Sequence, residues 1–406
     1  MHLYIVLAWR NLWRNRRRTL LSTVSIVLAV LFSLVMRSLQ NGTYDAMIRS
    51  AVGSYLGYLQ VHGAGYWESR SLDESIEVDA GVLSRLASLP GVTHAAPRLE
   101  SFALACRDSA TGVAQVVGVD PSAEDAMTGL SGRLTAGRYF GERERCALIG
   151  SGLASSLGIA VGDSIVLYGE GYRGITAAAR LPVAGIVTFP APEMNASLVY
   201  LPLDCARWLL GAPGRVTSVV LMLGSSSGLA PARRDAARAA GPGTEVMTWE
   251  EMAPDLVQAI QADSAGGVLM LLILYTVIGF GIFGTVMMMT AERLREFGVL
   301  IAVGLKRGKL MAVAALEAVA IALLGASAGV AAGIPLLWYL HRHPLSLTGE
   351  AAKAMIAYGL QPVLPFSIAP GIFAAQVTVV FVLGLLCALY PVAVIRKLRP
   401  VSAMRS

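Results

Sequence analysis

Charged side chains are scarce in this chain. Only 15% of its 406 residues are Asp, Glu, Lys or Arg, whereas 55% are hydrophobic, and the mean hydropathy is +0.60. Such a balance excludes an ordinary soluble domain and is typical of a membrane protein. The length leaves room for several membrane spans and one sizeable soluble domain.

Cysteine is also rare. The chain has four cysteines, too few for a disulfide-rich scaffold. Cys106, Cys146 and Cys205 lie in the long polar part of the sequence, so at most one bridge can join two of them, and Cys387 lies in a predicted span. The sequence leaves open whether such a bridge forms.

No catalytic, metal or nucleotide site is recognisable in the sequence. The segment GVLIAVGLKRGK resembles a phosphate-binding loop, but its spacing is wrong and it lies between two apolar runs. His341 and His343 form the only close histidine pair, and no nearby Cys, Asp or Glu completes a metal set. No Ser/His/Asp or paired-carboxylate arrangement stands out. We therefore expect no catalytic residue, metal ion or cofactor in this chain.

Long apolar runs predict four transmembrane helices. The clearest, Gly266–Ala291, has no charged side chain and would extend roughly 39 Å as a helix, more than the ~30 Å of a hydrocarbon core. Pro335 is expected to kink the third helix. The predicted spans are residues 19–39, 266–291, 310–340 and 370–395.

A basic arm precedes the first span. Residues 1–18 are expected to form an amphipathic helix in which Trp9 and Trp13 share one face and Arg10 and Arg14 another. A cleaved signal peptide is the alternative, because such peptides also place bases before an apolar stretch. The length of the apolar run and the lack of a small-residue cleavage site favour a retained span.

The long polar stretch, residues 40–265, predicts an α+β domain between the first and second spans. Its first part, about 40–100, alternates strand and helix signals and includes Asp79 as a helix cap; its last part, about 215–265, repeats the order strand, helix, strand. We expect these two parts to join into one α+β subdomain. A mostly β part, about 101–214, would be inserted between them.

The distribution of charge predicts the orientation. The N-terminal arm has five bases and no acid, the loop 292–309 has five bases and two acids, and the tail 396–406 has four bases and no acid. The positive-inside rule therefore places both termini and this loop in the cytoplasm, and the large domain and the loop 341–369 outside. Anionic lipid explains basic residues beside spans, so the charge does not indicate nucleic-acid binding.

Two features inside the spans call for an explanation. Gly325, Gly329 and Gly333 recur at every fourth residue, which predicts close approach of another helix, and Ser25, Ala29 and Ser33 repeat the small-residue pattern on the first span. The alternative is a loose preference for small residues. Glu317 lies about two turns inside the third span, where an ionised carboxylate is costly. Snorkelling or helix contact and a part in transport both remain open for Glu317.

The chain resembles the permease subunits of MacB/FtsX-type ABC transporters, also called type VII or mechanotransmission transporters. One span, a large external domain and three further spans follow in the family's order. LAWRNLWRNRRRTLLS is similar to the family's entry into its first span, and LEAVAIALLGASAGVAAG to its third. The outer segments GVDP, LTAGRYF, ALIGSGLASSLGIAVGDSIVL and LPVAGIV are similar to those of its periplasmic domain. ERLREFGVLIAVGLKRGKL resembles the family's signature between spans two and three.

This resemblance implies that residues 292–309 form a coupling helix that docks on a separate cytoplasmic ATPase. Two permease chains, identical or related, and two ATPases would form the complex, with ATP and Mg held by the ATPase. ATP binding would move the coupling helices, and the long helices would pass that movement to the outer domains. The implied coupling residues are Glu292, Arg293, Arg295, Glu296, Gly298 and Gly304.

Within the family, the chain is most similar to permeases that release lipoproteins from the bacterial inner membrane. The resemblance implies that acyl chains enter between spans one and two of opposite subunits; ordinary core or lipid-facing positions are the alternative. The sequence lacks a recognisable proline-rich loop of the kind that recruits a periplasmic carrier in those permeases. Whether a carrier or an adaptor is a partner is therefore left open by the sequence. Efflux of hydrophobic molecules with an adaptor, or FtsX-like signalling to a cell-wall hydrolase, are the alternative functions. The implied cavity residues are Leu31, Phe32, Val35, Met36, Leu269, Leu272 and Tyr275.

Overall fold

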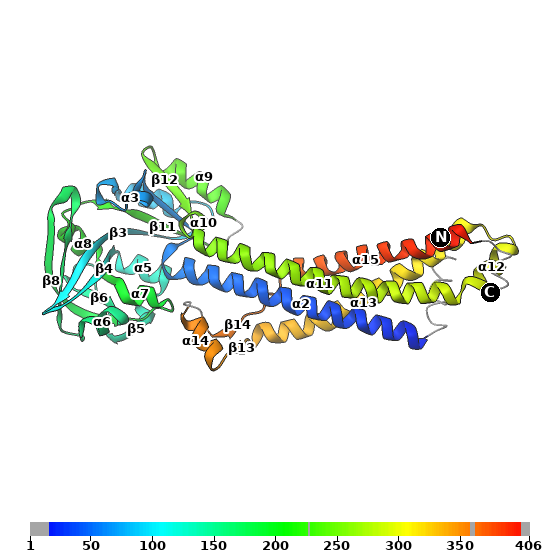
Figure 1. Cartoon of the computed structure of the whole chain (residues 1–406). Helices are drawn as coiled ribbons and strands as arrows, with labels where there is room; N and C mark the ends of the chain where they lie inside the picture. Colours follow the sequence, from blue (N-terminus) through cyan, green and yellow to red (C-terminus); the bar gives the residue numbers. More distant parts are fainter. Residues whose placement is uncertain (1–15, 226–227, 358–361, 399–406) are drawn as a thin grey trace. The chain divides into compact units, whose positions relative to one another are not determined.

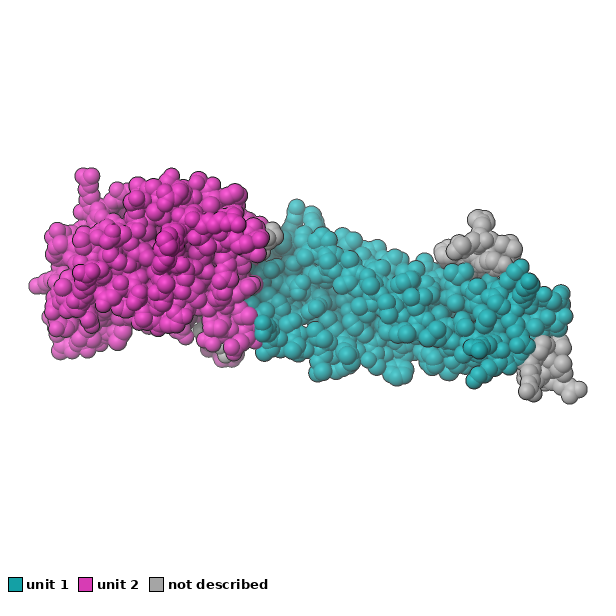
Figure 2. Space-filling view, turned by 90° about the horizontal axis from the view of Figure 1, so that it is seen from above, with its two compact units in different colours: residues 1–45, 259–346, 363–406 teal, residues 46–258, 347–362 magenta. Residues whose placement is uncertain are grey.

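The structure, a computed structural model, describes residues 16–225, 228–357 and 362–398 (Figure 1). It divides into two compact units, shown in different colours in Figure 2. The helical unit comprises residues 1–45, 259–346 and 363–406, and the sheet unit comprises residues 46–258 and 347–362. Most of the amphipathic helix predicted for residues 1–18, and residues 399–406 of the tail, lie outside the described residues.

Four long helices are apolar enough to cross a membrane, as the sequence predicts. Each is longer than the run that predicted it, because polar turns outside the apolar run continue the helix. The helix of the second span, for example, begins at Pro254, a residue suited to a first helical turn. The helix of the third span continues through Pro335. The four helices are α2 (Arg16–Ala51), α11 (Pro254–Glu292), α13 (Arg307–Arg342) and α15 (Pro370–Lys397).

Two short connections between the long helices are also structured. The charged loop contains α12 (Leu294–Ala302). The loop predicted at 341–369 contains the strands β13 (Leu345–Ser346) and β14 (Val363–Leu364), which pair antiparallel, and α14 (Glu350–Ala357).

The two flanking parts of the sheet unit join in one sheet, as predicted. The strands β12, β1, β11 and β3 are neighbours in that order, with antiparallel pairing throughout. Asp79 caps α4 (Ala80–Ala87) through a bond of 2.7 Å from the Val82 N–H to its Oδ1, and α9 (Leu229–Ala240) precedes β12. These strands are β1 (Leu59–Gly63), β3 (Val92–Arg107), β11 (Ser218–Leu223) and β12 (Thr244–Thr248).

The predicted boundary at residue 101 is wrong, because β3 runs through it without a break. The first half of β3 pairs with β11, and its second half with β7. Since β7 also pairs with β8, six strands close into a ring in the order β3, β4, β9, β6, β8, β7, which leaves these strands without open edges. The remaining strands of the sheet are β4 (Ala110–Val119), β5 (Leu134–Gly137), β6 (Ala147–Gly150), β7 (Ser164–Glu170), β8 (Thr176–Val187) and β9 (Leu198–Pro202).

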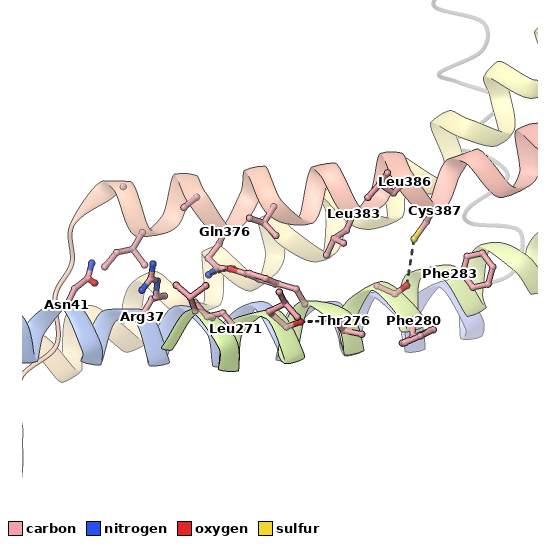
Figure 3. A pocket seen from close by; sticks show the side chains of 18 residues that line it. Arg37, Asn41, Leu271, Thr276, Phe280, Phe283, Gln376, Leu383, Leu386 and Cys387 are labelled. Carbon is pink, nitrogen blue, oxygen red and sulfur yellow. Dashed lines mark hydrogen bonds between the residues drawn. The ribbon is translucent and has the colours of Figure 1, made fainter. Parts of the chain in front are cut away.

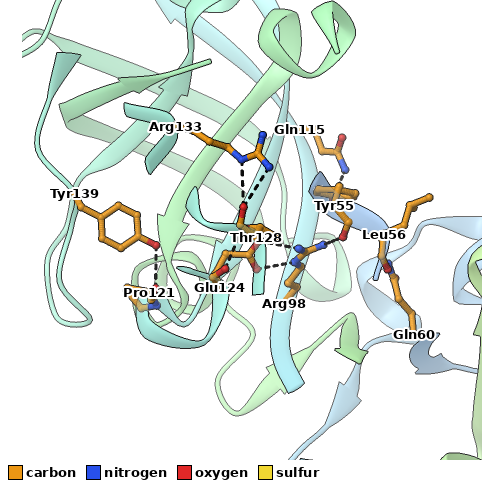
Figure 4. A network of polar contacts seen from close by, with 10 residues as sticks. All are labelled: Tyr55, Leu56, Gln60, Arg98, Gln115, Pro121, Glu124, Thr128, Arg133 and Tyr139. Atoms are coloured by element: carbon orange, nitrogen blue, oxygen red, sulfur yellow. Dashed lines mark hydrogen bonds and ion pairs between the residues drawn. The ribbon is translucent and has the colours of Figure 1, made fainter. Parts of the chain in front are cut away.

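A fully buried ion pair fixes the sheet to two helical segments (Figure 4). Arg98 of β3 binds Glu124 of α5 (Pro121–Thr128) through two hydrogen bonds of 2.9 and 2.7 Å. Arg98 Nη1 also donates to the carbonyl of Tyr55, at 2.6 Å, in the π-helical turn η1 (Val52–Leu56). Because the side chains of Arg98 and Glu124 are both removed from water, each depends on the other for its hydrogen bonds.

All four cysteines are free thiols, so the open question of a bridge is answered for this structure. Cys146, Cys205 and Cys387 are buried and Cys106 is half-buried. Burial raises the pKa of the Cys146 and Cys205 thiols to about 11, which keeps both protonated and unreactive.

Candidate functional site: a coupling segment and an apolar cleft

The coupling segment is a short helix with one buried face. Phe297 and Gly298 of α12 are buried, and Phe297 packs with Leu310, Ala314 and Ile395. After α12 the chain turns at Gly304, whose φ of +100° favours glycine. The turn returns the chain to α13 and leaves the other face of α12 exposed.

The exposed face of α12 carries both charged and apolar side chains. Of the six residues implied by the resemblance, Glu292, Arg295, Glu296 and Gly304 are exposed, Arg293 is half-buried and Gly298 is buried. The sequence-based list missed the apolar part of this face. That part consists of Val299, Leu300 and Val303, the last of which is 82% exposed. Apolar side chains at helical spacing on a loop helix suit docking into a groove of a partner.

Glu317 contacts the start of the coupling segment. Its Oε2 lies 2.5 Å from Arg293 Nη1, and Arg293 Nε lies 3.3 Å from Glu296 Oε2. Glu317 is buried in α13, so the guanidinium supplies the partner that a carboxylate needs at that depth. This geometry favours helix contact, one of the two roles that the sequence left open.

The glycine ridge of α13 packs against α2. A Cβ added to Gly325 would lie 2.5 Å from Ile26, one on Gly329 2.8 Å from Val30, and one on Gly333 2.8 Å from Leu34. Each of these distances is too short for carbon atoms in contact, so only glycine permits this approach. The small residues of α2 are not the partners. The Ser33 hydroxyl instead shares its one proton between the carbonyl of Val30 and Gln376 Oε1.

The helical unit also contains an apolar cleft of about 930 Å³ (Figure 3). Side chains of α11 and α15 form most of its wall, and Arg37 and Asn41 of α2 lie at one end. A hydrogen-bonded chain crosses it, since Gln376 accepts from Ser33 and donates to the hydroxyl of Tyr275 at 2.8 Å. Both ends of the Gln376 amide are therefore satisfied within the protein.

The implied cavity residues are not brought together in one chain. Leu272 and Tyr275 line the cleft, whereas the other five do not. Leu31, Val35 and Met36 are half-buried, and Phe32 and Leu269 are 66% and 65% exposed. The resemblance places the cavity between two subunits, so exposed positions on α2 and α11 are compatible with it.

Comparison with known proteins identifies the family. A family model described as the FtsX-like permease C-terminal domain matches residues 268–400, and one described as the MacB-like periplasmic core domain matches residues 19–239. The second match alone covers more than half of the chain. The chain belongs to the MacB/FtsX family of ABC transporter permeases. The predicted fold class is thereby confirmed: four candidate transmembrane helices with a MacB-like periplasmic domain between the first and second.

Curated relatives of this MacB/FtsX-type permease carry one name. The lipoprotein-releasing system transmembrane protein LolC of Neisseria meningitidis is 23% identical over 95% of this chain and 94% of its own length. The LolC of Xylella fastidiosa is 25% identical over 62% of each chain. The periplasmic region of MacB from Actinobacillus actinomycetemcomitans matches 52% of this chain and 95% of its own, at 12% identity and a TM-score of 0.37. The four candidate spans, the match to the MacB-like periplasmic core domain and the LolC relatives indicate a bacterial inner-membrane protein with a periplasmic domain.

Proposed function

We propose that this permease couples ATP hydrolysis by a separate cytoplasmic ATPase to the extraction of lipoproteins from the inner membrane. The observation that carries the proposal is the match to a lipoprotein-releasing LolC along 95% of the chain. Permeases of this family have no ATPase site of their own, so ATP and Mg would be bound by the partner subunit.

The exposed face of α12 supports a docking role for the coupling segment. Val299, Leu300 and Val303 would enter a groove of the ATPase, while Glu292, Arg295 and Glu296 set its register by charge. Docking requires this segment and both termini to face the cytoplasm. The ion pair between Arg293 and Glu317 would pass movement of α12 directly to α13.

Exposed apolar residues on α2 and α11 support a lipid-like substrate. Phe32, Leu269 and Leu272 are each more than 60% exposed. In a pair of permeases, identical or related, such positions would line a cavity for acyl chains between the subunits, together with Leu31, Val35, Met36 and Tyr275. A periplasmic carrier would then receive the released lipoprotein.

The test is a pull-down of the tagged chain from its native membrane in gentle detergent, followed by mass spectrometry of proteins and lipidated peptides. An ATPase together with acylated lipoproteins is the expected result. An ATPase with an adaptor and no lipoprotein would instead support efflux, and one with a cell-wall hydrolase would support signalling. Recovery without any ATPase would contradict the coupling role.

A paired substitution tests the docking face separately. Glu292→Lys with Glu296→Lys reverses two charges on the exposed face and should abolish stimulation of the ATPase by the permease, while insertion in the membrane is retained. Glu350→Lys, on the exposed helix α14, is the matched control. Unchanged stimulation in the paired variant would remove the proposed docking role.

A further inference from the structure

The cleft of the helical unit has a single charged side chain in its lining. Of the residues that line it, only Arg37 is ionised, and Asn41 lies on the same helix one turn away. The remainder is almost entirely apolar, with Leu272, Phe280 and Leu383 among the lining side chains. The cleft thus has one cationic end and an apolar length, the complement of an anionic amphiphile.

Arg37 is positioned at the level of lipid head groups. It follows directly on the uncharged run 19–36 of α2, which is about 27 Å long as a helix and therefore close to the thickness of a hydrocarbon core. An arginine at such a boundary faces phosphate groups rather than acyl chains. Head-group phosphate is thus within reach of this guanidinium.

The protein leaves the charge of Arg37 available. Its Nη1 donates to the uncharged Oε1 of Gln40 at 2.9 Å, and no ion pair to it is formed within the described part of the chain. Asp263 of α11 accepts instead from the Tyr44 hydroxyl at 2.6 Å and from Gln40 Nε2 at 3.3 Å. A phosphate would supply Arg37 with an anionic partner by charge-assisted hydrogen bonds.

The apolar part of the cleft is long enough for an acyl chain. Its lining on α11 extends from Val268 to Phe283, roughly 22 Å along the helix axis and more than the ~15 Å of one bilayer leaflet. The polar side chains along this part are bonded within the protein. Gln376 is bonded to Ser33 and Tyr275, and the Thr276 hydroxyl donates to the carbonyl of Leu272. A hydrocarbon chain can therefore lie beside these groups without breaking their hydrogen bonds.

We propose that the cleft binds one anionic phospholipid, with its phosphate on Arg37 and one acyl chain along α11 and α15. The acyl anchor of a lipoprotein carries thioether, ester and amide groups but no phosphate, so the charge of Arg37 favours the phospholipid. This site is thus distinct from the cavity between subunits, and the proposal does not depend on what the permease transports.

Lipid retention by the full chain tests the site. The purified chain is incubated with phosphatidylglycerol or with phosphatidylcholine of the same acyl composition and analysed by native mass spectrometry. We expect one tightly retained phosphatidylglycerol per chain and about tenfold less phosphatidylcholine, because the choline ammonium partly neutralises the phosphate that Arg37 would bind. Equal retention of the two lipids would overturn the proposal.

Two variants and one control locate the lipid. Arg37→Gln should reduce retention of phosphatidylglycerol to the level of phosphatidylcholine. Gly279→Leu should reduce retention of both lipids, because a Cβ at Gly279 meets only Leu383, at 3.8 Å, and the side chain would fill the cleft. Arg342→Gln, at the end of α13 and outside the lining, should change nothing. Equal losses in the two arginine variants would mean a diffuse charge effect and would overturn the site.

Photo-cross-linking distinguishes a lipid from a protein occupant. Phe280 is 72% exposed and lines the cleft, so a photoreactive benzoylphenylalanine in its place would label whatever fills it. An adduct with phosphatidylglycerol in vesicles that contain this lipid supports the proposal. A covalent dimer without a lipid adduct would show that a second copy of the chain covers the cleft, and would overturn it.

Discussion

Each unit of this permease contains a buried ion pair, but the two pairs differ in enclosure. In the sheet unit, the side chains of Arg98 and Glu124 are both 0% exposed, and two hydrogen bonds join them. In the helical unit, the side chains of Arg293 and Glu317 are 13% and 6% exposed. One contact joins this second pair, and Arg293 shares its charge with Glu296.

The difference in enclosure separates an ion pair whose contacts are fixed from one whose contacts can be rearranged. A fully enclosed charge has no alternative partner, so breaking its pair costs several kcal/mol. Arg293 has a second acid beside it, and both Arg293 and Glu317 line a groove of about 830 Å³ along the coupling segment. A docked partner can therefore reach the second pair and redistribute its contacts, whereas the first is closed to any partner.

The largest expected effect on stability comes from the enclosed pair. Glu124→Gln leaves the guanidinium of Arg98 buried without its counter-charge, so we expect the free energy of unfolding to fall by about 3–5 kcal/mol. Thermal unfolding of the full chain, followed by tryptophan fluorescence, measures it. Glu144→Gln is the control, because Glu144 pairs with Arg138 at the surface, where such pairs contribute at most about 1 kcal/mol. A similar loss of unfolding free energy in Glu124→Gln and Glu144→Gln would show that the enclosed pair contributes no more to stability than a surface pair.

The helical unit is held by close approach rather than by an enclosed pair. Gly329→Leu places a side chain where a Cβ already lies 2.8 Å from Val30, and overpacking of this kind costs about 1–3 kcal/mol. We expect a lower yield of folded protein in detergent by size-exclusion chromatography. Gly281→Leu is the matched control on α11, since a Cβ there meets nothing within 4 Å. Wild-type yield of Gly329→Leu would show that the ridge tolerates larger residues.

Protonation adds a pH-dependent term to the stability of the sheet unit. Burial lowers the pKa of His62 to about 3, so the folded state keeps this histidine neutral while the unfolded state binds a proton below about pH 6.5. The contribution of the neutral His62 to the free energy of unfolding is present above about pH 6.5 and is lost as the pH falls toward 3. From pH 7 to pH 5 we expect a loss of about 2 kcal/mol, which His62→Gln should abolish.

The same experiment needs two comparisons. Glu100 is buried and its pKa is raised by that burial, an effect of opposite sign, so the difference between wild type and His62→Gln isolates the histidine. His94→Gln, at an exposed position, should retain the wild-type profile. If His62→Gln unfolds with the wild-type dependence on pH, His62 is not responsible for the acid sensitivity.

Local signals in the sequence predicted local structure well. The uncharged runs identified all four long helices, and Asp79 identified the start of α4, because caps and hydropathy depend on near neighbours. The spacing of Gly325, Gly329 and Gly333 indicated close helix contact, which the structure confirms.

Features that join distant segments were not predictable in this way. Ser25, Ala29 and Ser33 repeat the small-residue pattern on α2, but Ile26, Val30 and Leu34 are the residues that face the ridge. Larger side chains pack opposite these glycines, so residue size alone did not identify the partner. Tertiary packing also decides three other features. These are the contact between Arg293 and Glu317, the ring of strands closed by β7, and the cleft formed by three helices.

The smallest expected loss of stability belongs to the half-open pair. Glu317→Gln keeps the shape of the side chain, and Arg293 retains Glu296, so we expect the free energy of unfolding to fall by about 1 kcal/mol, in the range of one hydrogen bond. Stimulation of the ATPase by the permease should nevertheless fall several-fold, because the charged contact between the coupling segment and α13 would be lost while the apolar packing of Phe297 remains. Arg293→Glu with Glu317→Arg should recover most of the stimulation lost in either reversal alone. If stimulation instead follows stability through this series, Glu317 only holds the fold together, and the two buried pairs do not differ in role.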